Sequence, residues 1–429
     1  MEHFDVVIIG GGVIGLSLAW RLSNGGGRIA VIDAGGTYGG AGALAHSVSG
    51  APETSKPIAT TPGSPIEHSA DDASTPDLGQ KPPATIAAAG MLAPSFETER
   101  SSIGEALSAL SFSSLARWPS FARDIATAAG VDIDFQQAGI LGVAFTNEQA
   151  DALRSASNAL AANALASGDI RSRLLDSRET LALEPAVNEK VLLGLISEND
   201  GQVDPVKLLK ALRIAIARRG VALIGDEAVH VDAPAPSSRT NKISIKMSKT
   251  SAVTTDRLVV AAGVWAGRLL SSINSPNVLA PVKGEALSLR AGRLIGRPIR
   301  APGAYLCPKS DGRLVIGATE AEGEWTLPPD TLRVEGLRMR AEAAAPQITT
   351  CKEDSRWAGL RPATPDRAPI LGPLPDNERI LLALGHHRNG VLLAPETSEI
   401  LSDHLLGNGD VDSSAGAAST RFSINRFSA

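Results

Sequence analysis

Cysteine and aromatic residues are scarce in this chain of 429 residues, and each shortage excludes a class of protein. The two cysteines, Cys307 and Cys351, are too few for a disulfide scaffold or a cysteine-rich zinc site. We therefore expect no metal. Aromatic residues make up 3% of the chain, and Tyr38 and Tyr305 are its two tyrosines. A tyrosine that serves a functional site must be one of these two.

A strong net charge and long apolar runs are also missing. The 41 basic and 46 acidic residues give a net charge of −5, which offers no field to attract nucleic acid or an anionic membrane. No apolar stretch approaches the length of a membrane span, and residues 1–9 lack the basic flank of a signal peptide. The sequence predicts a cytoplasmic protein that binds neither nucleic acid nor a membrane.

The chain opens with a strand, a tight turn and a helix. Asp5 to Ile9 is a β-branched run that ends in glycines, and Val13 to Leu22 has apolar residues at helical spacing. Arg28 to Ile32 is a second β-branched run. Such a βαβ unit predicts a parallel sheet at the N-terminus.

Glycines at the turn of this unit form a G-x-G-x-x-G pattern. Gly10 permits the tight turn, Gly12 lets the backbone approach a pyrophosphate at the helix N-terminus, and Gly15 lets helix and strand pack closely. Asp33 ends the second strand and can accept hydrogen bonds from ribose hydroxyls. In this context the motif indicates dinucleotide binding, but it does not separate FAD from NAD.

The later segments alternate between helices and short strands. We expect helices at 101–129, 147–166, 205–219, 331–345 and 391–406, and strands at 131–135, 140–145, 258–263, within 305–318 and at 380–384. Residues 39–83 contain seven prolines and no aromatic residue. Because they offer too little apolar surface to offset the entropy of ordering, they predict a disordered insertion. The rest predicts a parallel N-terminal sheet interrupted by an antiparallel second domain.

A second glycine-rich turn, Gly385 to Pro395 (GHHRNGVLLAP), enters a helix near the C-terminus. Unlike nicotinamide, a flavin ring stays bound during turnover and needs its own docking site. Backbone donors at this helix N-terminus could serve the pyrimidine edge of such a ring. The turn therefore favours a flavin.

Four blocks of the sequence share motifs with a known family: Val7 to Asp33, Thr85 to Pro94 (TIAAAGMLAP), Tyr305 to Thr319 (YLCPKSDGRLVIGAT), and Trp357 to Pro395 with WAGLRP and GHHRNG. In these blocks the chain resembles the D-amino-acid-oxidase-like FAD oxidoreductases, and among them the glycine-oxidase branch of thiamine biosynthesis (ThiO type). The resemblance extends over nearly the whole chain except the insertion and the tail. It implies an α/β fold, with a Rossmann-like FAD-binding domain and an interleaved antiparallel α+β substrate domain.

The resemblance also implies domain boundaries. The FAD-binding domain would be discontinuous and take residues 1–38, 84–100, 186–230, 250–275 and 355–408. The substrate domain would take residues 101–185 and 276–354, leaving 39–83 as the insertion and 409–429 as a tail.

The family pattern further implies which residues bind FAD. Val13 and Ile14 would bind the pyrophosphate beside the three glycines, and Thr85 would be a lone hydroxyl contact because Ile86 stands where Ser or Thr is common. The ribose and adenosine would contact Asp33, Ala34 and Ala228. One set of residues would lie beside the flavin: Ala89, Gly90 and Met91. A second set would enclose the flavin ring: His386, His387, Arg388, Asn389, Gly390, Val391 and Leu392.

Arg361 and Arg388 match positions that the family associates with the substrate carboxylate, and Tyr305 matches a tyrosine facing it. An arginine fork binds a planar carboxylate at two points and would fix the Cα hydrogen over the flavin. Because hydride transfer then needs only a neutral amine, no side chain is expected to act as a catalytic acid or base.

The implied reaction is oxidation of glycine, or of other small amines or D-amino acids, by dioxygen. It yields the imine or glyoxylate with ammonia and hydrogen peroxide and serves thiazole formation, with a thiazole synthase as a pathway partner. We also expect a homo-oligomer. Two alternatives stay open: a dehydrogenase for a D-amino acid, sarcosine or proline that reduces a quinone or a partner, and a flavin-binding module without turnover.

Overall fold

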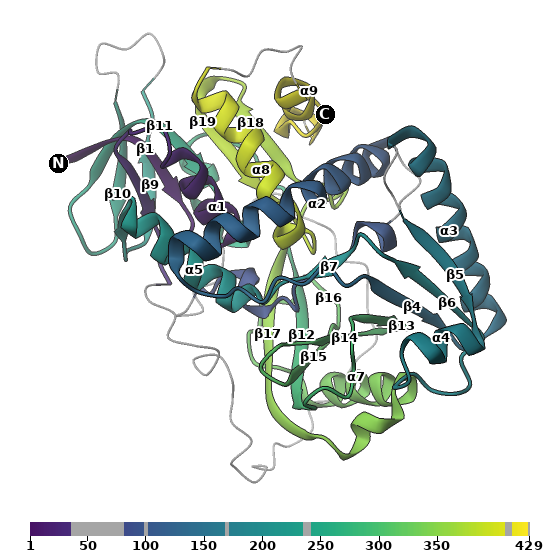
Figure 1. The fold of residues 1–429 in the computed structure, drawn as a ribbon. Helices are drawn as coiled ribbons and strands as arrows, with labels where there is room; N and C mark the ends of the chain where they lie inside the picture. Colours follow the sequence, from purple (N-terminus) through teal and green to yellow (C-terminus); the bar gives the residue numbers. More distant parts are fainter. Residues whose placement is uncertain (36–80, 98–101, 168–170, 235–241, 408–413, 428–429) are drawn as a thin grey trace, which may run out of the picture.

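The computed structural model describes residues 1–35, 81–97, 102–167, 171–234, 242–407 and 414–427. Two large sheets organise these residues, one of eight strands and one of nine. Figure 1 shows the sheets in different halves of the molecule: the purple N-terminal strand lies in one, and green strands from the middle of the sequence lie in the other.

Five parallel strands form the centre of the eight-stranded sheet. In spatial order they are β19 (Asn377–Leu384), β11 (Val253–Val260), β1 (Glu2–Ile9), β2 (Ile29–Ile32) and β8 (Ala222–Ile224). The β-branched run of β2 is fully buried, as a strand covered on both faces requires. Three antiparallel strands complete the sheet: β18 (Ile370–Leu374) on β19, β10 (Ile243–Met247) on β11 and β9 (Ala228–Asp232) on β10.

Helices cover the two faces of this sheet unequally. One face carries α1 (Val13–Leu22), α2 (Ser102–Ala129), α5 (Pro205–Arg218) and α8 (Gly390–Leu405). The other carries the β9–β10 ribbon and α6 (Gly267–Ser272). Alternate strand residues point to opposite faces, so Ile8 packs under the helices whereas Val7 packs under the ribbon. No helix in the described part of the chain is long and apolar enough to cross a bilayer.

The nine-stranded sheet is antiparallel except where β13 and β4 pair in parallel. In spatial order its strands are β16 (Ala321–Glu322), β12 (Ala280–Arg290), β15 (Arg313–Gly317), β14 (Ala304–Pro308), β13 (Ile299–Ala301), β4 (Ile140–Ala144), β6 (Leu193–Ser197) and β5 (Ser172–Asp176), with β17 (Lys352–Ala363) paired to β12. Its main core lies under α7 (Thr331–Ala344).

The remaining elements are short or peripheral. They are α3 (Asn147–Ser167), α4 (Ser177–Leu183) and α9 (Ser414–Arg421), the paired strands β3 (Met91–Leu92) and β7 (Gly201–Gln202), and 3₁₀ turns at Ala84–Ala87, Pro94–Phe96, Gly263–Ala266, Pro346–Thr350 and Ile424–Phe427.

The predicted α/β class, with its parallel N-terminal sheet and antiparallel second part, is confirmed. The strand predicted at 131–135 is wrong. Asp134 has a φ of 56°, and its backbone N–H donates to the Asp132 carboxylate at 2.9 Å. This local turn interrupts the apolar run because a residue with positive φ leaves the extended conformation.

The two sheets divide the chain differently from the predicted domain boundaries. β6 and most of β17 fall in the segments predicted for the FAD-binding domain, but both strands belong to the nine-stranded sheet. Helix α2 falls in a segment predicted for the substrate domain, and its fully buried Trp118 packs into the core under α1 and α8. Consecutive segments therefore alternate between the two halves of the molecule, and the predicted domain boundaries stay a prediction.

Two predicted irregular segments also differ in part. The insertion predicted at 39–83 lies outside the described residues up to position 80, but Lys81 to Pro83 are described and Pro82 is buried. The tail predicted at 409–429 contains α9, and Phe422 is buried against β18, where its carbonyl accepts a hydrogen bond from Leu371 N–H at 3.0 Å.

A buried ionic cluster fixes the segment after β16 to β12. Lys283 is 1% exposed, and its ammonium donates to Glu324 Oε1 at 2.8 Å, Thr326 Oγ1 at 2.9 Å and the Pro328 carbonyl at 2.8 Å. The carboxylate of Glu285, which is fully buried, lies 3.3 Å from the same ammonium. Lys283 therefore compensates two carboxylates, one of them wholly removed from water.

Replacing Lys283 by methionine is expected to lower the free energy of unfolding by about 3–5 kcal/mol, because the fully buried Glu285 would lose its nearest cation and keep only Arg333 Nε, at 3.8 Å. Urea denaturation of the full-length protein measures the change. The matched control is Arg28→Met, which breaks an exposed ion pair with Glu2 and should change the free energy of unfolding by less than about 1 kcal/mol. Equal stability of Lys283→Met and the wild type would contradict the role of the cluster.

Candidate functional site

A cavity of about 510 Å³ lies where the two sheets meet. Its walls include the carboxyl ends of β1, β2, β11 and β19 together with residues of β12, β14, β15 and β17. All of the predicted site residues line this cavity except Gly15. The structure thus brings together segments that are separated by up to about 380 positions in the sequence.

The first glycine-rich turn leaves no room for side chains. Gly10 has a φ of 125°, and a Cβ added there would lie 2.3 Å from the carbonyl oxygen of Ala261. A Cβ on Gly15 would lie 2.0 Å from the Gly10 carbonyl oxygen, so Gly15 acts beneath the turn and does not face the cavity. Gly12 is the N-cap of α1 and provides no side-chain cap, which leaves this helix N-terminus suited to an anionic ligand.

Thr85 lies beside this helix N-terminus, where its Oγ1 accepts a hydrogen bond from Val13 N–H at 3.1 Å. The neighbouring Ile86 instead packs against the helical core of the eight-stranded sheet. Thr85 therefore provides a hydroxyl at the turn, and the aliphatic side chain of Ile86 serves packing.

Asp33 at the end of β2 is held by two donors. Arg213 on α5 donates to Oδ2 at 2.9 Å, and Gly35 N–H donates to Oδ1 at 3.3 Å. Each carboxylate oxygen has further lone pairs for ribose hydroxyls. Ala34 also lines the cavity here. Sequence reasoning missed Arg213, because it lies 180 positions from Asp33 and no local spacing connects them.

The part of the cavity near Ala228 is also bounded by residues that the sequence did not point to. Lys81 Nζ donates to Glu227 Oε1 at 2.5 Å, and Trp265 Nε1 donates to the Pro82 carbonyl at 3.3 Å. Both contacts attach residues 81–82 to the cavity wall. The sequence did not indicate these two contacts, because residues 39–83 were predicted to be disordered.

The block Ala89, Gly90 and Met91 is fixed by a buried lysine. Lys309 Nζ donates to the carbonyls of Ala89 at 2.7 Å and Val203 at 3.0 Å and to Gln202 Oε1 at 3.2 Å. Gly90 has a φ of 84°, and its missing Cβ would lie 2.0 Å from the Val203 carbonyl oxygen. Burial lowers the pKa of Lys309, but three acceptors surround its ammonium.

The second glycine-rich turn presents backbone donors at the N-terminus of α8. Its N-cap, Asn389, makes no side-chain cap hydrogen bond. Helix α2 holds the first turn, since Ser114 Oγ and Trp118 Nε1 both donate to the Leu392 carbonyl, at 2.7 and 3.0 Å. Gly390 and Val391 complete the segment that lines the cavity. Such a terminus suits a ligand edge that accepts hydrogen bonds and carries negative charge.

His386 and His387 are neutral at physiological pH. Burial lowers the pKa of each imidazole to about 3, and the nearby positive charges of Arg388 and Arg361 add to this effect at His387. His386 Nε2 lies 3.2 Å from Thr397 Oγ1, whereas His387 Nε2 has no hydrogen-bond partner among the described residues. An imidazole with so low a pKa is a poor general base at neutral pH.

Tyr305 on β14 and Arg361 on β17 face the cavity together. Burial raises the pKa of the Tyr305 phenol, an effect that the adjacent Arg361 charge partly opposes, so the phenol keeps its proton at neutral pH. Arg361 Nη1 donates to the Thr319 carbonyl at 3.2 Å. No carboxylate of the described residues lies within 4.0 Å of the Arg361 guanidinium.

Arg388 lies in a different electrostatic setting. Its Nε is 3.2 Å from Glu97 Oε2, and its Nη1 is 3.5 Å from Glu320 Oε1. Arg300 binds the other oxygen of Glu97 at 3.2 Å. Sequence reasoning missed Arg300 and both glutamates because each lies beside or outside the quoted motifs, and their pairing depends on the meeting of the two sheets.

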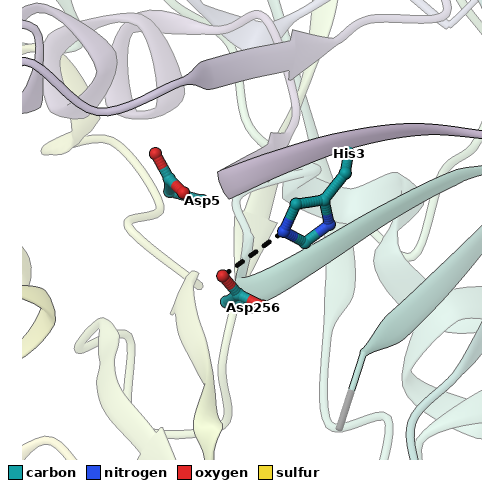
Figure 2. Close-up of side chains that lie close together, drawn as sticks. All are labelled: His3, Asp5 and Asp256. Carbon is teal, nitrogen blue, oxygen red and sulfur yellow. Dashed lines mark ion pairs between the residues drawn. The ribbon is translucent and has the colours of Figure 1, made fainter. Parts of the chain in front are cut away.

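A separate cluster lies away from this cavity, on β1 and β11. Figure 2 shows the His3 ring turned toward Asp256, and His3 Nε2 is 3.4 Å from Asp256 Oδ2. Asp5 completes the group, but its carboxylate accepts a hydrogen bond from Arg28 N–H at 2.7 Å. Because both carboxylates are exposed and each already has a partner, we assign no metal to this cluster.

The chain matches the profile of the FAD dependent oxidoreductase family (DAO) over residues 5–404. It is 31% identical to the glycine oxidase of Bacillus licheniformis over 409 residues, 95% of this chain and 94% of that protein. It is 34% identical to the bifunctional protein ThiO/ThiG of Synechocystis over 330 residues, 75% of this chain and 46% of that protein. The crystal structure of glycine oxidase from Geobacillus kaustophilus superposes with a TM-score of 0.80 at 27% identity and covers 99% of each chain.

The cofactor is therefore FAD, as predicted. The cavity fits this cofactor because two helix N-termini without side-chain caps and the Asp33 carboxylate line the same space. The roles of individual residues toward FAD remain predictions.

Thr85→Val is expected to raise the dissociation constant of FAD about tenfold, because the Val13 N–H would lose its hydroxyl partner in a buried turn, at a cost of about 1–3 kcal/mol. Titration of the apoprotein with FAD, followed by flavin fluorescence, measures the change. Thr85→Ser keeps the hydroxyl and should bind FAD like the wild type. Equal affinity of the valine and serine variants would remove Thr85 from the FAD site.

The buried histidines also predict acid sensitivity. Between pH 6.5 and 3 the unfolded chain protonates His386 and His387 whereas the folded protein does not, so the free energy of unfolding falls as the pH falls. Asp200 acts in the opposite sense, because burial raises its pKa to about 7 and the folded protein holds that proton. Two imidazoles against one carboxyl leave a net fall of about 1.4 kcal/mol per pH unit from these groups.

Urea midpoints at pH 7, 6 and 5 test this expectation. Asp200→Asn removes the opposing carboxyl and should make the fall between pH 7 and 5 steeper. Stability that is flat or rises on acidification would show that the two imidazoles take up protons in the folded state.

Proposed function

Because this chain belongs to the FAD dependent oxidoreductase family, we propose that it is an amino acid oxidase that acts on glycine. In the proposed reaction, glycine, dioxygen and water give glyoxylate, ammonia and hydrogen peroxide. The similarity to glycine oxidases over nearly the whole chain supports this choice of substrate.

Arg361 supports the proposal most directly, because among the described residues no carboxylate pairs with it. Three arginines line the cavity, and two of them, Arg300 and Arg388, are paired with glutamates. Arg361 is only partly exposed and has no such pair among the described residues. A charged guanidinium in this setting favours an anionic ligand, and the carboxylate of an amino acid matches its planar fork.

Tyr305 supplies a second contact of suitable chemistry. Its raised pKa keeps the hydroxyl protonated, so the hydroxyl can donate to the same carboxylate that Arg361 binds. Two donors on strands of the same sheet would fix both the position and the direction of the carboxylate. The Cα hydrogens of the substrate would then take a defined orientation, which is how positioning accelerates such a reaction.

FAD, when bound, supplies the two-electron acceptor for the Cα–H bond. The protein must then favour the neutral amine, since only its lone pair can form the imine. The five described acids of the cavity all have partners already, so they do not serve as bases here. Glu97 and Glu320 pair with arginines, Asp33 pairs with Arg213 and Glu227 pairs with Lys81. Asp226 accepts hydrogen bonds from Ser248 and Thr250. The two histidines are weak bases. We therefore propose that the amine loses its proton to solvent and that no side chain acts as an acid or base.

Arg388 takes a different role in this proposal from the one that the family resemblance implied. With Glu97 and Glu320 on its guanidinium, Arg388 would close the wall beside the substrate and leave the carboxylate to Arg361. We further propose dioxygen as the acceptor and use of the product with a thiazole synthase. The similarity to a bifunctional ThiO/ThiG protein supports that pathway.

Arg361→Ala is expected to raise the dissociation constant of glycine at least tenfold, the equivalent of about 1.4 kcal/mol, with the flavin content unchanged. Anaerobic titration with glycine, followed by flavin absorbance, measures this constant. Arg290→Ala is the control, because Arg290 is exposed and pairs with Asp354 outside the cavity. Unaltered glycine affinity in Arg361→Ala would remove this residue from the substrate site.

A panel of amino acids distinguishes the other functions. Peroxide released in air with glycine supports the oxidase, whereas reduction of a dye without peroxide, with sarcosine, proline or a D-amino acid, would favour a dehydrogenase. A bound flavin that no amine reduces would favour a binding module without turnover.

A further inference from the structure

The two groups proposed to hold the substrate carboxylate both rest against glycines on adjacent strands. Arg361 on β17 pairs with Val282 of β12, and Gly284 lies two residues further along the same face of that strand. Tyr305 on β14 pairs directly with Gly317 of β15. Both glycines line the cavity.

The guanidinium of Arg361 occupies the space that a side chain at position 284 would need. A Cβ built on Gly284 would lie 2.4 Å from Cζ, 2.4 Å from Nη2 and 2.5 Å from Nη1 of Arg361. These distances are far below van der Waals contact, and all three atoms belong to the guanidinium. The fork therefore lies flat against the bare backbone of Gly284.

The phenol of Tyr305 occupies the corresponding space at position 317. A Cβ on Gly317 would lie 2.4 Å from Cε2, 2.4 Å from the hydroxyl oxygen and 2.5 Å from Cζ of Tyr305. The hydroxyl end of the ring is thus directly over the glycine. Any side chain here would displace the atom that is proposed to donate to the substrate.

A fixed carbonyl completes the support for Arg361. The Thr319 carbonyl accepts from Nη1, and Thr319 is itself anchored to the residue that follows Gly284: its N–H donates to the Glu285 carbonyl at 3.2 Å, and its Oγ1 donates to Glu285 Oε2 at 2.8 Å. The buried Lys283–Glu285 pair holds this arrangement from the opposite face of β12. The orientation of the fork is therefore set by Gly284 below it and by Thr319 at its side.

We propose that Gly284 and Gly317 are positioning residues for the substrate carboxylate, because their missing side chains let Arg361 and Tyr305 lie against the sheet and aim their donors into the cavity. This inference rests on the proposed function, and it adds two residues that the sequence motifs did not single out. The glycines act through Arg361 and Tyr305 and do not themselves contact the substrate.

The substitution Gly284→Ala separates this role from a general need for glycine. Neither glycine has a positive φ, so alanine would meet no left-handed backbone strain at either position. The atoms that a new methyl group would meet belong to the far ends of side chains, so the methyl group is expected to shift the guanidinium or the phenol and leave the strands in place. Gly336→Ala on α7 is the matched control, because its Cβ would meet only Arg340 Nη1, at 3.4 Å.

The experiment measures acetate binding to holoenzyme by the change that acetate causes in the flavin absorbance spectrum. Acetate carries the carboxylate without the reacting amine, so the readout does not depend on turnover. We expect Gly284→Ala and Gly317→Ala each to raise the acetate dissociation constant at least tenfold and to raise KM for glycine in parallel, with unchanged FAD content. The control should bind acetate within twofold of wild type.

A double variant tests whether Gly284 acts through Arg361. Gly284→Ala combined with Arg361→Ala should bind acetate no more weakly than Arg361→Ala alone, because the displaced group is already absent. Additive losses would overturn the proposal, as would unchanged acetate binding in both glycine variants or no acetate binding by the wild type. If Gly284→Ala fails to fold, Gly317→Ala with Tyr305→Phe provides the same cycle at the second position.

The outcomes also separate this inference from the proposed function. Suppose that acetate binding depends on Gly284 but that free glycine does not reduce the flavin. This result would refute glycine as the substrate and leave the positioning role of Gly284 and Gly317 standing. If free glycine reduces the flavin equally well in the wild type and in the Gly284→Ala and Gly317→Ala variants, the proposed substrate stands and the positioning role of the two residues is refuted.

Discussion

Parallel pairing of β1 with β2 on one side and β11 on the other is the constraint on which the rest of the structure depends. Parallel strands place their carboxyl ends at one edge of the sheet, and ligands bind beyond that edge in such folds. Here the edge gathers the turn into α1, Asp33 at the end of β2 and the turn from β19 into α8. These three segments offer different donors and acceptors, and we propose that one extended cofactor uses them together.

The second requirement is close approach of backbone to backbone and of side chain to backbone. On the cofactor side, Gly10 and Gly90 occur where a Cβ would collide with a carbonyl oxygen of a neighbouring segment. On the substrate side, Gly284 and Gly317 occur where a Cβ would collide with the end of a side chain. The first kind of contact is rigid, because backbone cannot yield, whereas the second lets a substitution displace one functional group without unfolding the sheet.

Charge distribution then distinguishes arginines that look alike in sequence. Arg361 and Arg388 both lie in motif blocks of the C-terminal third. Among the described residues, Arg361 faces the cavity without a carboxylate, whereas Arg388 is held between Glu97 and Glu320. A paired arginine has its charge satisfied before any substrate arrives. This difference is the reason we propose Arg361 as the substrate anchor.

The sequence by itself determined the opening βαβ unit and, through its motif blocks, the family and the flavin cofactor. Every site residue that it pointed to except Gly15 lines the cavity, because those residues depend on local spacing of glycines, β-branched runs and motif residues. Tertiary structure alone decided that Arg213 holds Asp33, that Lys309 fixes Ala89, that α2 supports the first turn of α8 and that Glu97 pairs with Arg388. It also overrode the apolar run at 131–135, where Asp134 turns the chain. Local periodicity specifies which elements form, whereas pairing between residues about two to three hundred positions apart depends on how two interleaved sheets pack, and no short-range pattern encodes that packing.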